Sequence, residues 1–93
     1  MKPTIGRIVY YTLTEQDANN ILAKRAKVAG DGPAVGNHAA AGDVYPAMVV
    51  RVFDPTSGTS NLQVMLDGTD TYWATSRKEG AEPGTWAWPP RVG

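Results

Sequence analysis

The chain has 93 residues, which is enough for one domain but too few for two independent hydrophobic cores. Its hydrophobic content of 42% and charged content of 19% are ordinary for a globular protein and argue against disorder. Nine basic side chains balance nine acidic ones, so the net charge supports neither general nucleic-acid binding nor attraction to anionic membranes.

The absence of cysteine rules out a disulfide framework and a thiolate metal site. The first residues, MKPTIGRIVYY, contain no long apolar core followed by a small-residue cleavage pattern, so we expect no signal peptide. No apolar run approaches the roughly 20 residues that a membrane helix needs. These features are typical of a cytosolic protein.

The N-terminal segment 5–13, IGRIVYYTL, is rich in β-branched and aromatic side chains and predicts a strand. Val9 and Tyr11 would share one face of this strand, and Ile8 and Tyr10 would share the other. Because both faces carry apolar side chains, we expect each face to be partly buried.

A helix is predicted over residues 15–28. Thr14 is a suitable N-cap, and Asp17 lies three positions later, where its carboxylate can complete a capping box. The basic side chains near the C-terminal end are expected to be solvated, although contact with an anionic ligand is an alternative. The apolar stripe of this helix consists of Ala18, Ile21, Leu22, Ala26 and Ala29.

Residues 30–42, GDGPAVGNHAAAG, consist mostly of Gly and Ala and predict a flexible loop. His38, the single histidine, lies in this loop. A proton shuttle or metal ligand is conceivable, but no second ligand follows at metal-binding spacing. We therefore expect His38 to be exposed and without a chemical role.

The remainder, residues 44–88, predicts four antiparallel strands separated by polar Gly turns. The first of them, 44–53, is apolar on both faces, which is typical of a central strand. Pro46 cannot donate to a ladder, so the first half of that strand is expected at an edge or a bend. Arg51 is its one charge before the turn, and it either lies along the surface or points into a cleft.

These elements predict one domain over residues 1–93, mainly β with one inserted helix. Short strands, tight turns and a bent antiparallel sheet favour a small SH3-like barrel. Trp86 and Trp88 alternate with Ala87 and would share one face, so this pair is expected to fill the core.

Catalytic chemistry finds little support in the residues. Acid–base catalysis needs two carboxylates in unlike environments, but Asp67 and Asp70 flank a Gly turn and are explained by that turn. The serines carry no nucleophile motif, and the Gly-rich loop lacks a phosphate-binding ending. We therefore expect neither enzymatic activity nor a metal or cofactor.

Aromatic and arginine side chains are the remaining candidates for a site. Rings can stack on a planar ligand, and guanidinium groups pair with phosphates. The alternative is that the tryptophans only fill the core. The candidate ligand-binding residues are Arg51, Tyr72, Trp73, Arg77 and Trp86.

Several short motifs are distributed over nearly the full length of the chain. They are Gly6–Tyr10, Thr14–Asp17, Gly42–Ala47, Val49–Val52, Asn61–Val64, Asp67–Gly68, Trp73–Ser76, Gly84–Trp86 and Trp88–Pro89. In these motifs the chain resembles a set of small, uncharacterised proteins encoded by tailed bacteriophages and prophages. The resemblance implies a phage origin and a place in the host cytoplasm. It carries over no activity.

Small phage proteins of this kind often counteract host defences, in some cases by sequestering a nucleotide signal. By that association we expect a non-enzymatic accessory protein that binds a small nucleotide-type ligand. A chain of this size has little concave surface, so such a pocket would lie between subunits of a homo-oligomer. The alternative is a protein–protein interaction module, either a host-protein inhibitor or a virion assembly factor. An enzyme is the third and least supported class.

Overall fold

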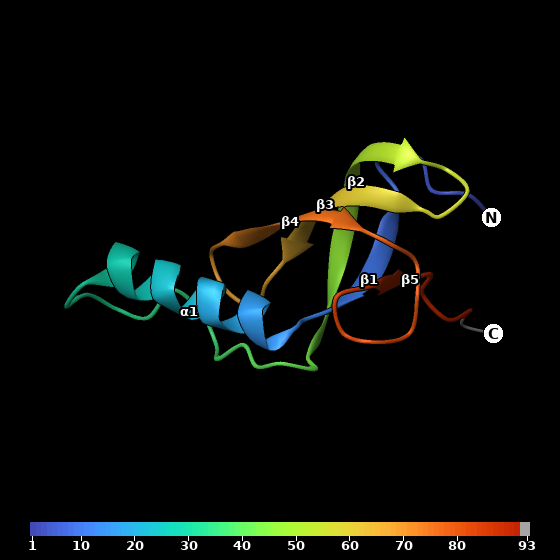
Figure 1. Cartoon of the computed structure of the whole chain (residues 1–93). Helices are drawn as coiled ribbons and strands as arrows, with labels where there is room; N and C mark the ends of the chain where they lie inside the picture. Colours follow the sequence, from blue (N-terminus) through green and yellow to red (C-terminus); the bar gives the residue numbers. More distant parts are fainter. Residues whose placement is uncertain (92–93) are drawn as a thin grey trace.

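A computed structural model describes residues 1–91 of the chain. One helix and five strands follow one another along the sequence (Figure 1). Their bounds are β1 Ile8–Thr12, α1 Glu15–Ala29, β2 Val44–Asp54, β3 Thr59–Met65, β4 Thr71–Arg77 and β5 Trp86–Ala87. The prediction of a mainly β chain with one helix inserted after the first strand is confirmed.

The five strands form one antiparallel sheet in the order β4-β3-β2-β1-β5. The sheet is not closed, so the predicted SH3-like barrel is not confirmed at that level of detail. The two edges approach each other at one isolated bridge, where Glu79, just after β4, lies next to Trp86 of β5. Helix α1 extends away from the strands along the long axis of the molecule (Figure 1).

The strand register divides the side chains into an inner and an outer face. Val9 pairs with Ala47, and Ala47 pairs with Val64, so these three residues lie in one row of the inner face. All three are fully buried. The core of the protein contains Val9, Tyr11, Leu13, Ile21, Ala39, Ala47, Val49, Leu62, Val64, Leu66, Ala74 and Trp86.

The first half of strand β2 has a paired neighbour on one side only, which confirms the expectation that this half lies at an edge. Pro46 pairs with Tyr10 of β1. On the other side, the ladder with β3 begins only at Ala47, opposite Val64. Pro46 therefore occupies a position at which no β3 pairing requires its missing N–H.

Helix α1 begins as the sequence predicts. The Thr14 side chain accepts a hydrogen bond from the Asp17 backbone N–H at 2.9 Å, and the Asp17 carboxylate accepts one from the Thr14 N–H at 3.0 Å. This is the predicted capping box, which satisfies two donors at the helix start.

The buried side of α1 differs from the predicted stripe. Ala18 and Ile21 are buried, whereas Ala26 is exposed. Arg25, which was expected to be solvated, is only 8% exposed. Arg25 lies one turn beyond Ile21 on the same side of the helix, and a carboxylate from the sheet neutralises it there.

The segment between α1 and β2, predicted as a flexible loop, makes specific contacts. Gly36 forms an isolated bridge with Gly68 in the β3–β4 turn, and the Asn37 N–H donates to the Asp67 carbonyl oxygen at 2.8 Å. Ala39 is fully buried. Among residues 1–91, no helix is long and apolar enough to cross a membrane.

Candidate functional site

Three features of the structure are candidates for a site: a buried carboxylate, a pocket under α1, and the outer face of the sheet. The buried carboxylate belongs to Asp17, which is 1% exposed. Its oxygens accept hydrogen bonds from the hydroxyl groups of Tyr11 and Tyr72, the latter at 2.8 Å. Arg77 completes the group with an ion pair at 3.0 Å.

The protonation of this cluster follows from its contacts. Burial by itself raises the pKa of Asp17, but the Thr14 N–H, the two tyrosine hydroxyls and the Arg77 charge together hold that pKa below its ordinary value. Burial and the neighbouring carboxylate raise the pKa of Tyr11 and of Tyr72. The cluster is therefore an ionised carboxylate with neutral tyrosines at pH 7, and its lone pairs are already used.

This arrangement suits a structural role. A general base needs a free lone pair and a pKa near the working pH, and Asp17 has neither. Instead, its carboxylate links the start of α1 to β1 through Tyr11 and to β4 through Tyr72 and Arg77. The cluster positions the helix on the sheet.

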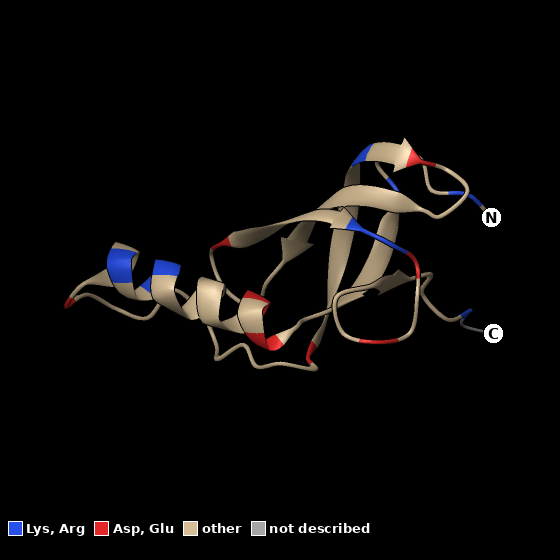
Figure 2. Cartoon of the chain, viewed as in Figure 1, with Lys and Arg blue, Asp and Glu red and all other residues tan. Residues whose placement is uncertain are grey.

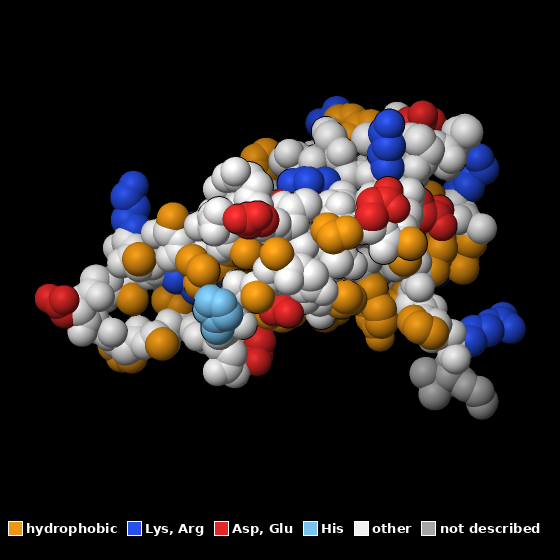
Figure 3. Space-filling view, turned by 60° about the horizontal axis from the view of Figure 1, so that its bottom comes forward, with side chains coloured by type: hydrophobic (Ala, Val, Ile, Leu, Met, Phe, Trp, Pro, Cys, Tyr) orange, Lys and Arg blue, Asp and Glu red, His pale blue; other side chains and the backbone are white. Residues whose placement is uncertain are grey.

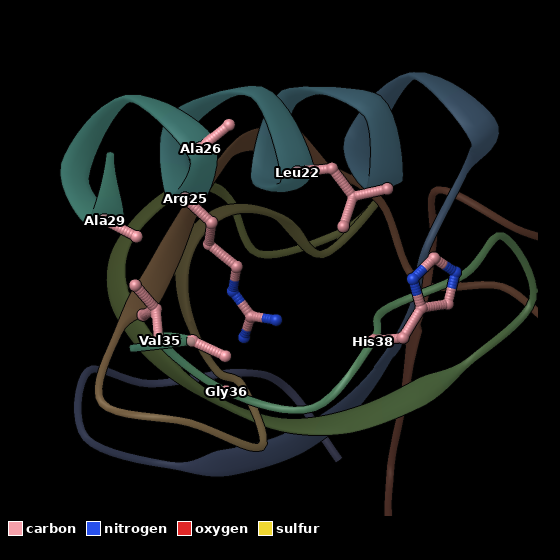
Figure 4. Close-up of a pocket in the computed structure, with 8 residues that line it drawn as sticks. Leu22, Arg25, Ala26, Ala29, Val35, Gly36 and His38 are labelled. Atoms are coloured by element: carbon pink, nitrogen blue, oxygen red, sulfur yellow. The ribbon is translucent and has the colours of Figure 1, made fainter. Parts of the chain in front are cut away.

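A pocket of about 310 Å³ lies between α1 and the loop that follows it (Figure 4). The Arg25 side chain extends into this space from the helix, and His38 lies at the opposite side. Figure 3 shows the same hollow beside His38, with hydrophobic side chains around it. The lining residues are Leu22, Arg25, Ala26, Ala29, Ala34, Val35, Gly36 and His38.

The charge inside the pocket is already neutralised. Arg25 makes two hydrogen bonds of 2.9 Å to Asp70, and its third nitrogen donates to the Asn37 carbonyl oxygen at 2.6 Å. These bonds use the guanidinium edges that an anionic ligand would need. His38 is exposed, as expected, and residues 1–91 contain no group of three His, Asp or Glu side chains that could hold a metal ion.

The outer face of the sheet is apolar and has no covering layer among the described residues. One row of paired residues runs across β1, β2, β3 and β4, and a second row beside it consists of one β1–β2 pair and one β3–β4 pair; the register places these side chains opposite the core. The first row is Ile8, Met48, Gln63 and Trp73, and the second holds the pairs Tyr10–Pro46 and Met65–Thr71. We call these eight residues the outer face.

Large side chains of the outer face are strongly exposed. Trp73 is 59% exposed, Ile8 44%, Tyr10 41% and Met65 37%. Val44, the first residue of β2, and Val50, in the middle of that strand, are also exposed. Together these side chains leave on the order of 500 Å² of apolar surface in water, at the upper end of what monomers expose in one patch.

The structure does not bring the five sequence-predicted residues together. Trp86 is fully buried and donates its indole N–H to the Gly58 carbonyl oxygen at 3.0 Å. Tyr72 and Arg77 are on the inner side, bonded to Asp17. Trp73 projects from the outer face.

Arg51 belongs to the outer side as well, because it pairs with Asn61, two positions from Gln63 on β3. It is exposed, and its guanidinium carbon lies 4.9 Å from the centre of the Phe53 ring. The five candidates therefore form two groups on opposite sides of the sheet rather than one wall.

The sequence contained a signal for the outer face. Apolar side chains occur on both faces of residues 5–13 and 44–53, which was interpreted as burial on both sides. In the structure one of those faces is exposed, so the same pattern marks an uncovered apolar surface.

Comparison of the chain with protein-family models, curated proteins and solved structures gave no match.

Proposed function

We propose that the protein is a non-enzymatic protein-interaction module that binds its partner through the outer face. The observation that carries this proposal is the exposure of Trp73, Ile8, Tyr10 and Met65 in two adjoining rows of one sheet. A contiguous apolar patch of this kind is typical of a protein–protein contact.

The area of the patch sets the free energy that its burial can supply. Covering on the order of 500 Å² of apolar surface is worth on the order of 10 kcal/mol before association costs are subtracted. Exposed aromatic side chains such as Trp73 and Tyr10 are the residue types that most often dominate binding energy at interfaces. None of the eight outer-face residues is charged, so covering them buries no unpaired charge.

An SH3-like architecture is part of the proposal. The strand order and the bridge between Glu79 and Trp86 support a bent sheet that closes incompletely. In such a fold the inner face is filled by its own core, so the outer face is the surface available to a partner.

A nucleotide-type ligand is the second candidate, and one observation favours it. Trp73 and Arg51 are both exposed on the outer side of the sheet, where a ring could stack on a base and a guanidinium could pair with a phosphate. With the resemblance to small phage proteins, this supports sequestration of a host-defence signal as the alternative function.

The test of the interaction module uses affinity-tagged protein purified after chemical cross-linking in the cells that produce it. The wild type is compared with Trp73→Glu, and Val28→Glu is the matched control. Val28 is 70% exposed and apolar, but it lies on α1, away from the outer face. We expect a stoichiometric protein partner, either another protein or a second copy, with the wild type and with Val28→Glu, and its loss with Trp73→Glu.

The same preparations test the nucleotide candidate. Mass spectrometry of the released small molecules and calorimetry with cyclic nucleotides report on a ligand directly. Equal recovery of the partner by the wild type and Trp73→Glu would refute the interaction module. A nucleotide that is retained by the wild type and lost with both Arg51→Ala and Trp73→Ala would establish the alternative.

A further inference from the structure

We infer that the partner is a second copy of this chain, and that two outer faces pack against each other around a two-fold axis. The inference rests on the proposed function of the outer face as a protein-binding surface. It goes further because it commits to an isologous dimer, in which each copy presents the same residues to the other.

The size of the patch fits a dimer. A standard interface buries about 800 Å² on each partner, of which slightly more than half is apolar. The exposed apolar surface here, on the order of 500 Å², supplies that apolar share. The polar side chains Gln63 and Thr71, within the outer face, and Asn61 beside it supply polar area in the same region.

The middle of the outer face is self-complementary. Gln63 lies between Met48 and Trp73 in the first row. Its amide group both donates and accepts, so two copies of Gln63 can bond to each other across a two-fold axis. A charged residue at this position would instead face its own copy and repel it.

The two ends of the sheet differ in their charged residues. Arg7 and Arg51 lie at the end where β1 begins and β2 approaches its last residue. Asp43, just before β2, and Asp67, just after β3, lie at the other end. Figure 2 marks the charged residues along the ribbon, with one basic and one acidic segment next to each other at the end of β2. A two-fold axis across the strands reverses their direction, so each basic end meets the acidic end of the other copy.

One acidic residue at the basic end is already engaged. The Asp54 carboxylate accepts hydrogen bonds from the Thr56 N–H at 3.0 Å and from the Ser57 hydroxyl at 3.1 Å, within its own turn. The Asp43 and Asp67 carboxylates are engaged as well: Asp43 accepts from the Ala40 N–H at 2.9 Å, and Asp67 accepts from the Asn37 side-chain amide at 2.8 Å. Of the residues named, one end of the sheet carries two arginines and one aspartate, and the other end carries two aspartates.

The mass in solution tests the inference. The chain has a mass of 10.0 kDa, so light scattering after size exclusion should give twice that value for the wild type and for Val28→Glu. Trp73→Glu should raise the dimer dissociation constant at least 100-fold while circular dichroism stays unchanged. Trp73 is also the one strongly exposed tryptophan among residues 1–91, so its fluorescence should shift to shorter wavelength as the concentration rises.

A cross-link gives a second readout that needs no disruptive change. Because the chain has no cysteine, Gln63→Cys introduces the single thiol of the protein. Mild oxidation should convert this variant to a covalent dimer at micromolar concentration. Lys27→Cys, exposed on α1, is the control and should stay monomeric under the same conditions.

The outcomes separate this inference from the proposed function. A monomer at all concentrations, with a different protein bound through Trp73, overturns the second copy and leaves the interaction module in place. A monomer whose outer face captures nothing overturns both. A dimer that survives Trp73→Glu and gives no Gln63→Cys cross-link places the contact elsewhere and overturns the inference.

Discussion

Removal of the Asp17 carboxylate should be among the most damaging single substitutions outside the hydrophobic core. This side chain is 1% exposed, and it receives hydrogen bonds from two tyrosines, from the Thr14 backbone and from Arg77. Asp17→Ala leaves all of these donors without their acceptor. The loss therefore combines the helix cap with a buried polar network.

The magnitude follows from the individual contacts. Loss of a helix cap costs about 1 kcal/mol, and each hydrogen bond to a buried charged group contributes about 1.5–3 kcal/mol. The ion pair counts for less than a fully buried one, because the Arg77 side chain is 25% exposed. Taken at the low end, the cap and the two tyrosine hydrogen bonds add to about 4 kcal/mol, which is the loss in the free energy of unfolding that we expect for Asp17→Ala. Asp17→Asn, which keeps an acceptor oxygen, should cost about 2 kcal/mol.

Urea unfolding monitored by circular dichroism measures these losses. Glu15→Ala is the matched control, because Glu15 is an exposed acid in the same first turn of the helix. It should change the free energy of unfolding by less than about 0.5 kcal/mol. A double-mutant cycle with Tyr72→Phe should give a coupling energy of about 1 kcal/mol. A cost below about 1 kcal/mol for Asp17→Ala, or one equal to that of Glu15→Ala, would refute the reasoning.

Three further outcomes are expected. First, the pKa of Asp17 is lowered in the folded state, so the unfolded chain binds this proton first as the pH falls. The stability that Asp17 contributes is present above about pH 4 and is lost as the pH falls through the folded pKa. In urea titrations from neutral to acid pH, Asp17→Asn should therefore flatten the acid side of the stability curve, and an unchanged slope would contradict the assignment. Second, Gly36→Ala should destabilise the protein by about 1–3 kcal/mol, because the new Cβ atom would overlap the backbone at Gly68. Gly32→Ala, whose Cβ atom would approach only the Ala29 carbonyl oxygen at 3.0 Å, should cost less, and the same thermal melts compare the two. Third, Arg25→Met should increase hydrogen exchange at residues 36–38 by at least tenfold, whereas protection equal to the wild type would show that the loop is held without the guanidinium.

The sequence alone was sufficient for the elements that depend on local chemistry. The capping box of Thr14 and Asp17 was predicted because its two hydrogen bonds join residues three positions apart. Strict alternation is sufficient to place Leu62 and Val64 on one face, since a strand side chain reverses its direction at every residue, and both are fully buried. Tyr72 and Trp73, as neighbours in a strand, lie on opposite faces for the same reason.

Contacts between distant segments were not accessible from the sequence. Arg25 was expected in solvent because the helix pattern gives no sign of Asp70, which lies 45 positions further along the chain. The loop at residues 30–42 was expected to be flexible because its composition does not reveal that Gly36 packs against Gly68. In both cases the fold brings a distant residue, Asp70 or Gly68, into contact, and nothing in the sequence around that residue identifies it as a contact partner.

For the candidate site, too, some properties follow from the sequence and others only from the tertiary structure. The sequence alone showed that all three tryptophans lie in the second half of the chain. The tertiary structure decided which of the candidate residues are accessible: Trp86 fills the core, Tyr72 and Arg77 hold Asp17, and Trp73 faces solvent. A single strand pattern shows that two faces are apolar, but only the packing of helix and sheet determines which face is covered. The uncovered face, on which both proposals rest, is therefore a property of the folded chain.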